Sequence, residues 1–387
     1  MDIKINNKNL LTFLKDLIRI NSVNPSLSDE GDGEFRIARY VGEYLKELGL
    51  DVHYQEIEKN RINVIGILKG TGDGQSIMLN GHTDTVSVER MEIDPFEPEN
   101  KDGRIYGRGS LDMKAGLAAQ IMAVQSIIES GRVLKGDVIL TFVADEEYAS
   151  IGTEAVLKEY SADAAIICEP TNLDIVIAHK GFAWTKIEVF GRAAHGSLPE
   201  KGVDAIVKAG KVLTEIENLG ESGLTQKKHP LLGSPSIHAS LISGGIGLST
   251  YPDYCKIELE RRTLPGEDKV IVAEEIQNIL QDIKSKDNQF KANFEVFFTR
   301  PAYEIAKEKP IVKSLSRAYE LMQGKKPEFR GMGGWIESAL LVEAGIPTVI
   351  FGPSGEGSHA SVEYVDFNSV IMTTEILIEL ITDFCSG

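Results

Sequence analysis

The segment MLNGHTDTV, residues 78–86, ends a short apolar run with a glycine, a histidine and an aspartate. A run of this kind predicts a buried β-strand, and in open α/β sheets ligands bind beyond the carboxyl ends of the strands. His82 is therefore expected at the edge of a sheet, with its imidazole available to a metal ion. Asp84 can accept the other ring N–H and fix the tautomer that binds metal. A histidine satisfied within a turn is the alternative.

Helical and strand periodicities alternate on both sides of this segment. Apolar residues recur at helical spacing in 10–18, 37–48, 115–129 and 153–160, and strand-like runs occupy 63–68, 76–79, 137–143 and 164–167. Short apolar runs separated by helices are typical of a parallel sheet covered on both faces. The sequence therefore predicts an α/β fold with a mainly parallel sheet flanked by helices.

The pattern changes near residue 177 and returns after Pro301. Strand signals at 182–190, 236–242, 254–261 and 291–298, with helices at 203–218 and 270–284, predict two helices on a small antiparallel sheet. Residues 220–235 are expected to form a long loop. Helices at 311–322, 337–344 and 368–384 and a strand at 348–351 rejoin the first pattern. We predict a catalytic domain of 1–177 and 299–387 and an inserted α+β domain of 178–298.

Composition and charge exclude several classes of protein. The 387 residues include 58 Asp and Glu against 41 Lys and Arg, a formal net charge of -17, so neither nucleic acid nor an anionic membrane is an expected partner. The beginning of the chain lacks a signal-like apolar run and no stretch reaches the ~20 apolar residues of a membrane span, so a cytoplasmic location is expected. Cys168, Cys255 and Cys385 are an odd number without a C-x-x-C pair, which disfavours disulfides and thiolate metal sites.

A glycine-rich loop at residues 107–116, GRGSLDMKAG, precedes the helix predicted at 115–129. A dinucleotide loop would place glycine where Asp112 stands, and its carboxylate would repel a pyrophosphate. Nucleotide-dependent chemistry is thereby disfavoured. Asp112 could instead bridge two cations, with its charge stabilised by the helix N-terminus. The alternative is an aspartate that only caps the helix.

Acidic and imidazole side chains follow three further strands. Residues 145–147 are three adjacent acids, which repel one another unless positive charge, usually a metal, offsets them. One glutamate can then bind metal while its neighbour accepts a proton from water; a solvated acidic turn is the alternative. Glu169 follows the apolar run at 164–168, and His359 lies in the loop after the strand at 348–351. Five strand ends thus carry candidate ligands.

This ordered set of motifs resembles the family of two-zinc amidohydrolases that includes acetylornithine deacetylase, succinyl-diaminopimelate desuccinylase, aminoacylase and glutamate carboxypeptidase. The likeness spans nearly the whole chain and implies a zinc-exopeptidase-like catalytic domain with an inserted lid and dimerisation domain. It implies that Asp112 bridges two metal ions, with the ligands His82 and Glu169 on one side and Glu147 and His359 on the other. It further implies that Glu146 is the general base for a hydroxide held between the ions, and that Asp84 supports His82. The ligand types suit two divalent ions, zinc or else cobalt or manganese.

Two motifs in the inserted domain carry further implications of the resemblance. GRAAHGSLP, residues 191–199, is similar to a lid motif whose histidine, here His195, reaches the partner subunit's active site and donates to the developing oxyanion. A homodimer is therefore implied. Arg262 matches an arginine that grips a substrate carboxylate, although a solvated strand arginine is the alternative. Two departures, at residues 248–251 before Pro252 and at Ile336-Glu337, leave the substrate identity open.

The expected function is the hydrolysis of N-acyl amino acids, small molecules with a free carboxylate, by an enzyme of the acetylornithine deacetylase type that serves arginine biosynthesis. A dipeptidase, a carboxypeptidase or a succinyl-diaminopimelate desuccinylase would use the same centre. A non-catalytic metal-binding protein is a more remote alternative, because Glu146 and every implied ligand are retained.

Overall fold

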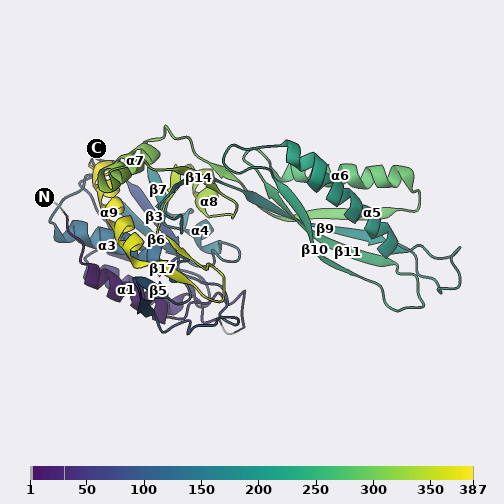
Figure 1. Cartoon of the computed structure of the whole chain (residues 1–387), viewed down its shortest axis with the longest axis horizontal. Helices are drawn as coiled ribbons and strands as arrows, with labels where there is room; N and C mark the ends of the chain where they lie inside the picture. Colours follow the sequence, from purple (N-terminus) through teal and green to yellow (C-terminus); the bar gives the residue numbers. More distant parts are fainter. Residues whose placement is uncertain (1–2, 30, 387) are drawn as a thin grey trace. The chain divides into compact units, whose positions relative to one another are not determined.

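The structure, a computed structural model, describes residues 3–29 and 31–386, which fall into two compact units (Figure 1). Unit 1 takes the chain before Ala178, the segment Ile305–Arg330 and the chain from Ile336 onward. Unit 2 takes Ala178–Glu304 and Gly331–Trp335. The catalytic and lid roles that the sequence assigns to 1–177 with 299–387 and to 178–298 stay a prediction.

Unit 1 is built on a sheet whose central strands are parallel, which confirms the predicted α/β class. The order is β1-β2-β6-β3-β7-β15-β8, with parallel pairing from β6 to β15 and antiparallel pairing at both ends. The strands are β1 (Asp51–Glu58), β2 (Arg61–Leu68), β3 (Ile77–His82), β6 (Val138–Val143), β7 (Ala164–Ile167), β8 (Ile175–His179) and β15 (Thr348–Ile350). Two short strands, β13 (Tyr303–Glu304) and β14 (Phe329–Met332), also pair with β8.

Helices cover this sheet because its central strands are apolar on both faces. Strands β3, β6 and β7 are buried at every residue, as expected of a parallel sheet between two helical layers. Helix α3 packs on β3 and β6 and is itself covered by α1 and α9, whereas α2 and α4 pack on β1 and β2. The helices are α1 (Asn7–Arg19), α2 (Phe35–Glu47), α3 (Lys114–Glu129), α4 (Ile151–Val156), α7 (Pro310–Gln323), α8 (Ser338–Glu343) and α9 (Phe367–Phe384).

A second, smaller sheet in unit 1 joins two loops that are far apart in the sequence. Its order is β16-β17-β5-β4, from β4 (Glu99–Lys101), β5 (Arg104–Tyr106), β16 (Gly355–Glu356) and β17 (Tyr364–Asp366). The register pairs Tyr364 with Tyr106 and Asp366 with Arg104. The end of the hairpin 357–363 therefore lies beside the beginning of the loop 107–113.

Unit 2 is an antiparallel sheet with two helices, as the sequence predicts. The sheet order is β10-β11-β9-β12, and α5 and α6 pack on it. Alternate residues of β9 and β11 are buried, and they form the core with the apolar faces of both helices. The elements are β9 (Gly181–Phe190), α5 (Ala205–Asn218), β10 (Ser236–Gly244), β11 (Tyr254–Thr263), α6 (Lys269–Lys286) and β12 (Lys291–Arg300).

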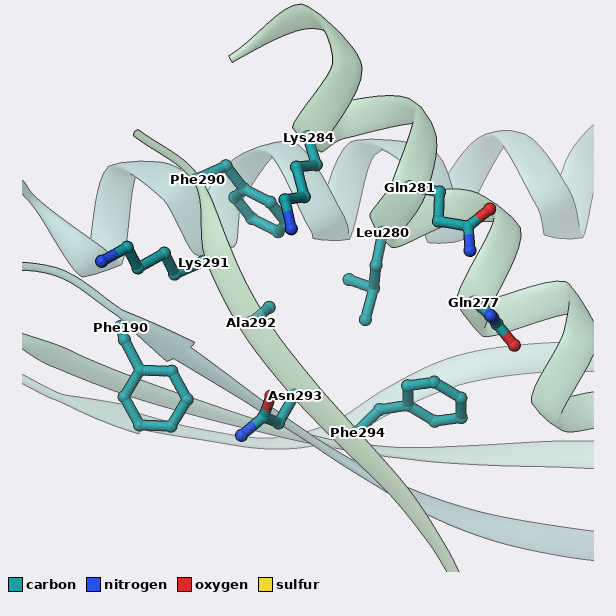
Figure 2. Close-up of a pocket in the computed structure, with 10 residues that line it drawn as sticks. All are labelled: Phe190, Gln277, Leu280, Gln281, Lys284, Phe290, Lys291, Ala292, Asn293 and Phe294. Atoms are coloured by element: carbon teal, nitrogen blue, oxygen red, sulfur yellow. The ribbon is translucent and has the colours of Figure 1, made fainter. Parts of the chain in front are cut away.

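A groove of about 920 Å³ lies in unit 2 between the second half of α6 and the start of β12 (Figure 2). Phe290 and Leu280 contribute apolar surface, and Lys284 and Lys291 stand beside it. None of the site residues predicted from sequence lines this groove.

Several elements differ from the sequence prediction. Strand β1 was not predicted, and α4 ends at Val156 rather than at residue 160. The expected loop at 220–235 begins with a π-helical turn, Leu219–Gly223, and a short 3-10 helix, Leu224–Gln226. All three cysteines are buried free thiols. Among the described residues, no helix is both long and apolar enough to cross a membrane.

Candidate metal centre

Five side chains from separate segments of unit 1 meet beyond the carboxyl ends of the parallel strands. His82 is the last residue of β3, Glu147 follows β6 and Glu169 follows β7. Asp112 comes from the loop before α3, and His359 from the hairpin after β15. Because β6, β3, β7 and β15 run parallel, their carboxyl ends share one edge. The expected convergence of these residues is present.

The five side chains form two groups that share Asp112. His82, Asp112 and Glu169 offer ligand atoms that all lie within 4.8 Å of one another, and so do Asp112, Glu147 and His359. His82 Nε2 lies 3.2 Å from Asp112 Oδ1 and 3.5 Å from Glu169 Oε1. His359 Nε2 lies 3.4 Å from Asp112 Oδ2 and 3.0 Å from Glu147 Oε2. Each Asp112 oxygen thus faces one group, the arrangement required of a bridging carboxylate.

Asp84 supports His82 differently from the expectation. The ring nitrogen His82 Nδ1 lies 2.9 Å from the main-chain oxygen of Asp84 but 3.6 Å from its carboxylate. In the neutral ring, a carbonyl acceptor at Nδ1 places the proton there and leaves Nε2, which faces Asp112 and Glu169, as the nitrogen that can bind a metal. The Asp84 carboxylate instead accepts the backbone N–H groups of Glu146 and Glu147, at 3.1 and 3.2 Å. Asp84 therefore also holds the turn that carries both glutamates.

The three adjacent acids at 145–147 are divided between two environments. Asp145 is buried, and Arg61 Nη2 donates to its Oδ1 at 2.6 Å. Glu146 and Glu147 turn toward His82 and His359, with side chains only 12% and 6% exposed. The alternative of a solvated acidic turn is therefore wrong. Part of the repulsion expected at this turn is offset by Arg61 and not by a metal.

Arg61 belongs to a buried polar network that sequence reasoning missed. Its guanidinium pairs with Glu34 as well as Asp145, and Asn24 Nδ2 donates to both Asp84 and Asp145. The network thus reaches from β2 to the residue that orients His82. An arginine opening the fully buried first part of β2 is a signal that could have been noticed, because a buried arginine needs acidic partners.

The loop that carries Asp112 is held by hydrogen bonds from its backbone N–H groups, and Asp112 does not cap the following helix. The N-cap of α3 is Met113, without a side-chain hydrogen bond, so the alternative that Asp112 only caps this helix is wrong. Gly109 has a φ of +74°, and a Cβ there would lie 2.7 Å from Thr85 Cγ2, so both conformation and space require glycine. Glu363 accepts the N–H groups of Gly109, Leu111 and Asp112. No local sequence signal pointed to Glu363.

The electrostatics of the cluster show an excess of buried negative charge. Burial raises the pKa of Glu146 and Glu169 well above the ordinary value, and neighbouring carboxylates raise it further. Burial and the Asp112 charge raise the pKa of Glu147. Hydrogen bonds to Asp112 and Glu147 raise the pKa of His359 to about 10. The cluster therefore holds protons at neutral pH unless cations replace them.

The residues present fit a pair of divalent cations. Glu147 Oε1 is buried and has no hydrogen-bond partner among the described residues, which is unusual unless an ion occupies that position. Two imidazoles and three carboxylates, without a thiolate, form a donor set suited to zinc, cobalt or manganese. The assignment of His82, Asp112, Glu147, Glu169 and His359 as ligands stays a prediction that this geometry supports.

His195 and Arg262 lie in unit 2. His195 is exposed, and its Nδ1 lies 2.8 Å from Ser197 Oγ within the same loop. Arg262 donates from Nε to Glu260 at 2.7 Å, and its guanidinium lies 5.3 Å from the centre of the Phe182 ring. The Arg262 side chain is 31% exposed on strand β11, so the alternative of a solvated strand arginine stays open. Catalytic and substrate-binding roles for the two residues remain predictions.

Glu337, where the sequence departs from the family pattern, lies in unit 1 close enough to interact electrostatically with Glu146 and Glu169. It is buried beside the start of α8, and its charge contributes to raising the pKa of both Glu146 and Glu169. This residue adds to the negative charge around the site.

Comparisons with known proteins identify the family of the chain. The sequence profile of peptidase family M20/M25/M40 matches residues 78–383. An acetylornithine deacetylase of Buchnera aphidicola is 30% identical over 387 aligned positions, covering 97% of this chain and 98% of the relative. An N-formyl-4-amino-5-aminomethyl-2-methylpyrimidine deformylase of Bacillus subtilis is 28% identical over 409 aligned positions, covering 97% and 95%.

Solved structures show the same fold at lower identity. A tripeptidase of Staphylococcus aureus matches with a TM-score of 0.82 and 23% identity, covering 99% of this chain and all of that one. A peptidase of Bacillus subtilis, described as a dinuclear metal-binding member of family M20, matches with a TM-score of 0.76 and 18% identity over 98% of each chain. The profile covers well over half of the chain, and the relatives are matched over nearly their whole length. The chain therefore belongs to peptidase family M20/M25/M40 and is a metallohydrolase.

Proposed function

We propose that the protein is a two-metal amidohydrolase that removes a small acyl group from the nitrogen of an amino acid. The observation that carries this proposal is the convergence of two imidazoles and two further carboxylates around the shared Asp112, with Glu146 beside them. Relatives named acetylornithine deacetylase and a formyl-removing deformylase support a small acyl group.

The two groups of ligands would each hold one ion. His82 and Glu169 would complete the first site and Glu147 and His359 the second, with Asp112 in both. When bound, such ions polarise the scissile carbonyl and lower the pKa of water. Zinc is the metal we propose, with cobalt or manganese as replacements.

Glu146 is suited to move the proton in this reaction. Its carboxylate is mostly buried, lies 4.0 Å from His82 Nε2, and has a pKa raised by burial and neighbouring carboxylates. A base with a raised pKa can accept a proton from water and give it back within one cycle. The water oxygen bonds to the carbonyl carbon, the C–N bond breaks, and Glu146 passes the proton to the departing amine nitrogen. Asp84 keeps Glu146 in place through the backbone N–H.

Arg262 is the residue we propose for the substrate's free carboxylate. Glu260 accepts from its Nε, and Trp184 Nε1 donates to the same Glu260 carboxylate at 3.1 Å. These contacts fix the guanidinium plane, and a fixed planar fork binds carboxylates well. Replacing Arg262 with lysine should raise KM for N-acyl amino acids far more than it lowers kcat.

A homodimer is the assembly we propose, with His195 of each protomer acting at the partner's centre. Strand β10 is an edge of the unit 2 sheet, and Leu241 and Ile242 on it are 63% and 56% exposed. Exposed apolar edges of this kind readily pair with another strand. A mixture of H195A and E146Q proteins tests the arrangement, since each heterodimer would regain one intact centre. Equal mixing should restore about a quarter of the wild-type rate, and no recovery would refute the shared centre.

The test of the function itself is a substrate panel with metal-stripped and reconstituted protein. N-acetyl and N-formyl amino acids should be hydrolysed only after zinc or cobalt is restored, and faster than N-succinyl amino acids or dipeptides. Faster cleavage of dipeptides would replace the deacylase assignment by a peptidase. No turnover of any amide, despite two bound ions, would argue for a non-catalytic protein.

A further inference from the structure

Glu363 is a fully buried carboxylate whose two oxygens accept four hydrogen bonds from one loop. Oε1 accepts the backbone N–H groups of Leu111 and Asp112, at 2.9 and 3.0 Å. Oε2 accepts the backbone N–H of Gly109 at 3.0 Å and Arg108 Nη1 at 2.7 Å. Every donor lies on the segment that delivers Asp112. A buried carboxylate with this many donors fixes the path of the backbone around it.

The same residue also anchors the hairpin that carries His359. Glu363 stands directly before β17, four residues after His359, and its main-chain oxygen accepts Gly107 N–H at 3.1 Å. Arg108 makes a second connection to the hairpin, because its Nη2 donates to the main-chain oxygen of Ala360 as well as to that of Ser87. The ion pair between Arg108 and Glu363 therefore joins the hairpin to the Asp112 loop.

The hairpin needs such an anchor because its tip is exposed. Residues 358–360 are exposed, and the His359 side chain itself is 55% exposed, in contrast to the 1% of His82. His82 is fixed by its strand and by the surrounding core. His359 has a φ of +63° in a short loop and depends on what holds the ends of that loop.

We infer that Glu363, paired with Arg108, is a positioning residue for the Asp112–Glu147–His359 site. It sets the separation between two ligands that are 247 positions apart in the sequence. The site that contains His82 and Glu169 depends on Glu363 through Asp112 alone, because its other two ligands stand at or just after the ends of core strands. This inference rests on the proposed function only in assuming that the two groups bind metal.

The substitution Glu363→Gln tests the inference with little change in shape. The amide oxygen of glutamine can accept two of the four hydrogen bonds that Glu363 accepts, but its NH₂ group then faces the remaining two donors and repels them. Metal-free protein would be titrated with zinc against a chromophoric chelator in two backgrounds. H82A leaves the His359 site as the main site, and H359A leaves the His82 site. Loss of a residue that orients metal ligands typically weakens metal affinity about 10- to 100-fold.

We expect a loss of that size from E363Q in the H82A background and a much smaller one in the H359A background. Equal losses in both backgrounds, or none in either, would overturn the inference. The matched control is E267Q in unit 2, which removes a carboxylate, 9% exposed, that accepts Leu264 N–H and Arg261. E267Q should lower the unfolding temperature without changing zinc affinity.

The variant R108K keeps the experiment decisive if E363Q does not fold. Lysine retains the charge beside Glu363 but cannot also donate to both Ser87 and Ala360. It should weaken the same site, by less than E363Q would. Wild-type zinc affinity at that site in R108K would overturn the inference. Failure of the wild-type protein to bind two ions would instead count against the proposed function.

Discussion

Replacing Glu146 with glutamine should separate metal binding from turnover. The exchange preserves shape and removes one of the buried negative charges around His82, so both ions should stay bound. General bases typically contribute about 10²- to 10⁴-fold to the rate, or about 3 to 5 kcal/mol of barrier. We expect a loss in the upper half of that range, because the Glu146 side chain is only 12% exposed and buffer bases cannot readily replace it.

The assay compares kcat, metal content and thermal unfolding for E146Q and for its neighbour variant E147Q. E146Q should keep two ions per chain and lose turnover. E147Q should lose an ion and turnover together, because Glu147 Oε2 faces His359 at 3.0 Å. Retention of more than about a tenth of wild-type kcat in E146Q would refute the reasoning, since a general base contributes at least about 10²-fold. Loss of both ions from E146Q would also refute it.

Three further predictions concern the proposed metal ligand His359 and the buried Arg61, which pairs with Glu34 and Asp145. H359A should bind one ion per chain instead of two, measured by elemental analysis after desalting. Zinc binding to the wild type should release protons and tighten as the pH rises from 6 to 8, because the pKa of His359, raised to about 10, keeps this residue protonated until metal displaces the proton. Calorimetry in buffers of different ionisation enthalpy would count the released protons. A zinc affinity that does not change with pH would contradict this expectation. R61M should lower the free energy of unfolding, measured in urea, by about 3–5 kcal/mol, because it leaves Glu34 and Asp145 buried without their cation. R317M breaks only an exposed pair with Asp383 and should lower the same free energy by about 1 kcal/mol or less.

Four of the five ligand candidates could be predicted because they stand at the end of, or after, an apolar run, whereas Asp112 was indicated by the glycine-rich loop before a helix. His82 and Glu169 stand at or directly after buried strands, and parallel strands bring their carboxyl ends to one edge. The same logic located the three acids 145–147 after β6, and the family resemblance singled out Glu147 among them as the ligand. Asp145 was grouped wrongly with its two neighbours, because no local pattern shows that Arg61, 84 positions earlier, pairs with it.

The supporting residues could not be predicted because their partners are distant in the sequence. Glu363 contacts Asp112 across 251 positions through a sheet whose strands β16 and β17 have two and three residues. Strands this short have no periodicity to read. Strand β1 was missed for a related reason: as an edge strand it buries no residue fully, so its sequence lacks an apolar run.

The most direct test of the central claim is the anomalous diffraction of crystals grown from cobalt-loaded protein. Two peaks should lie on either side of the Asp112 carboxylate, one against His82 and Glu169 and the other against Glu147 and His359. A single peak that excludes Asp112, or ions bound away from these five side chains, would contradict the account.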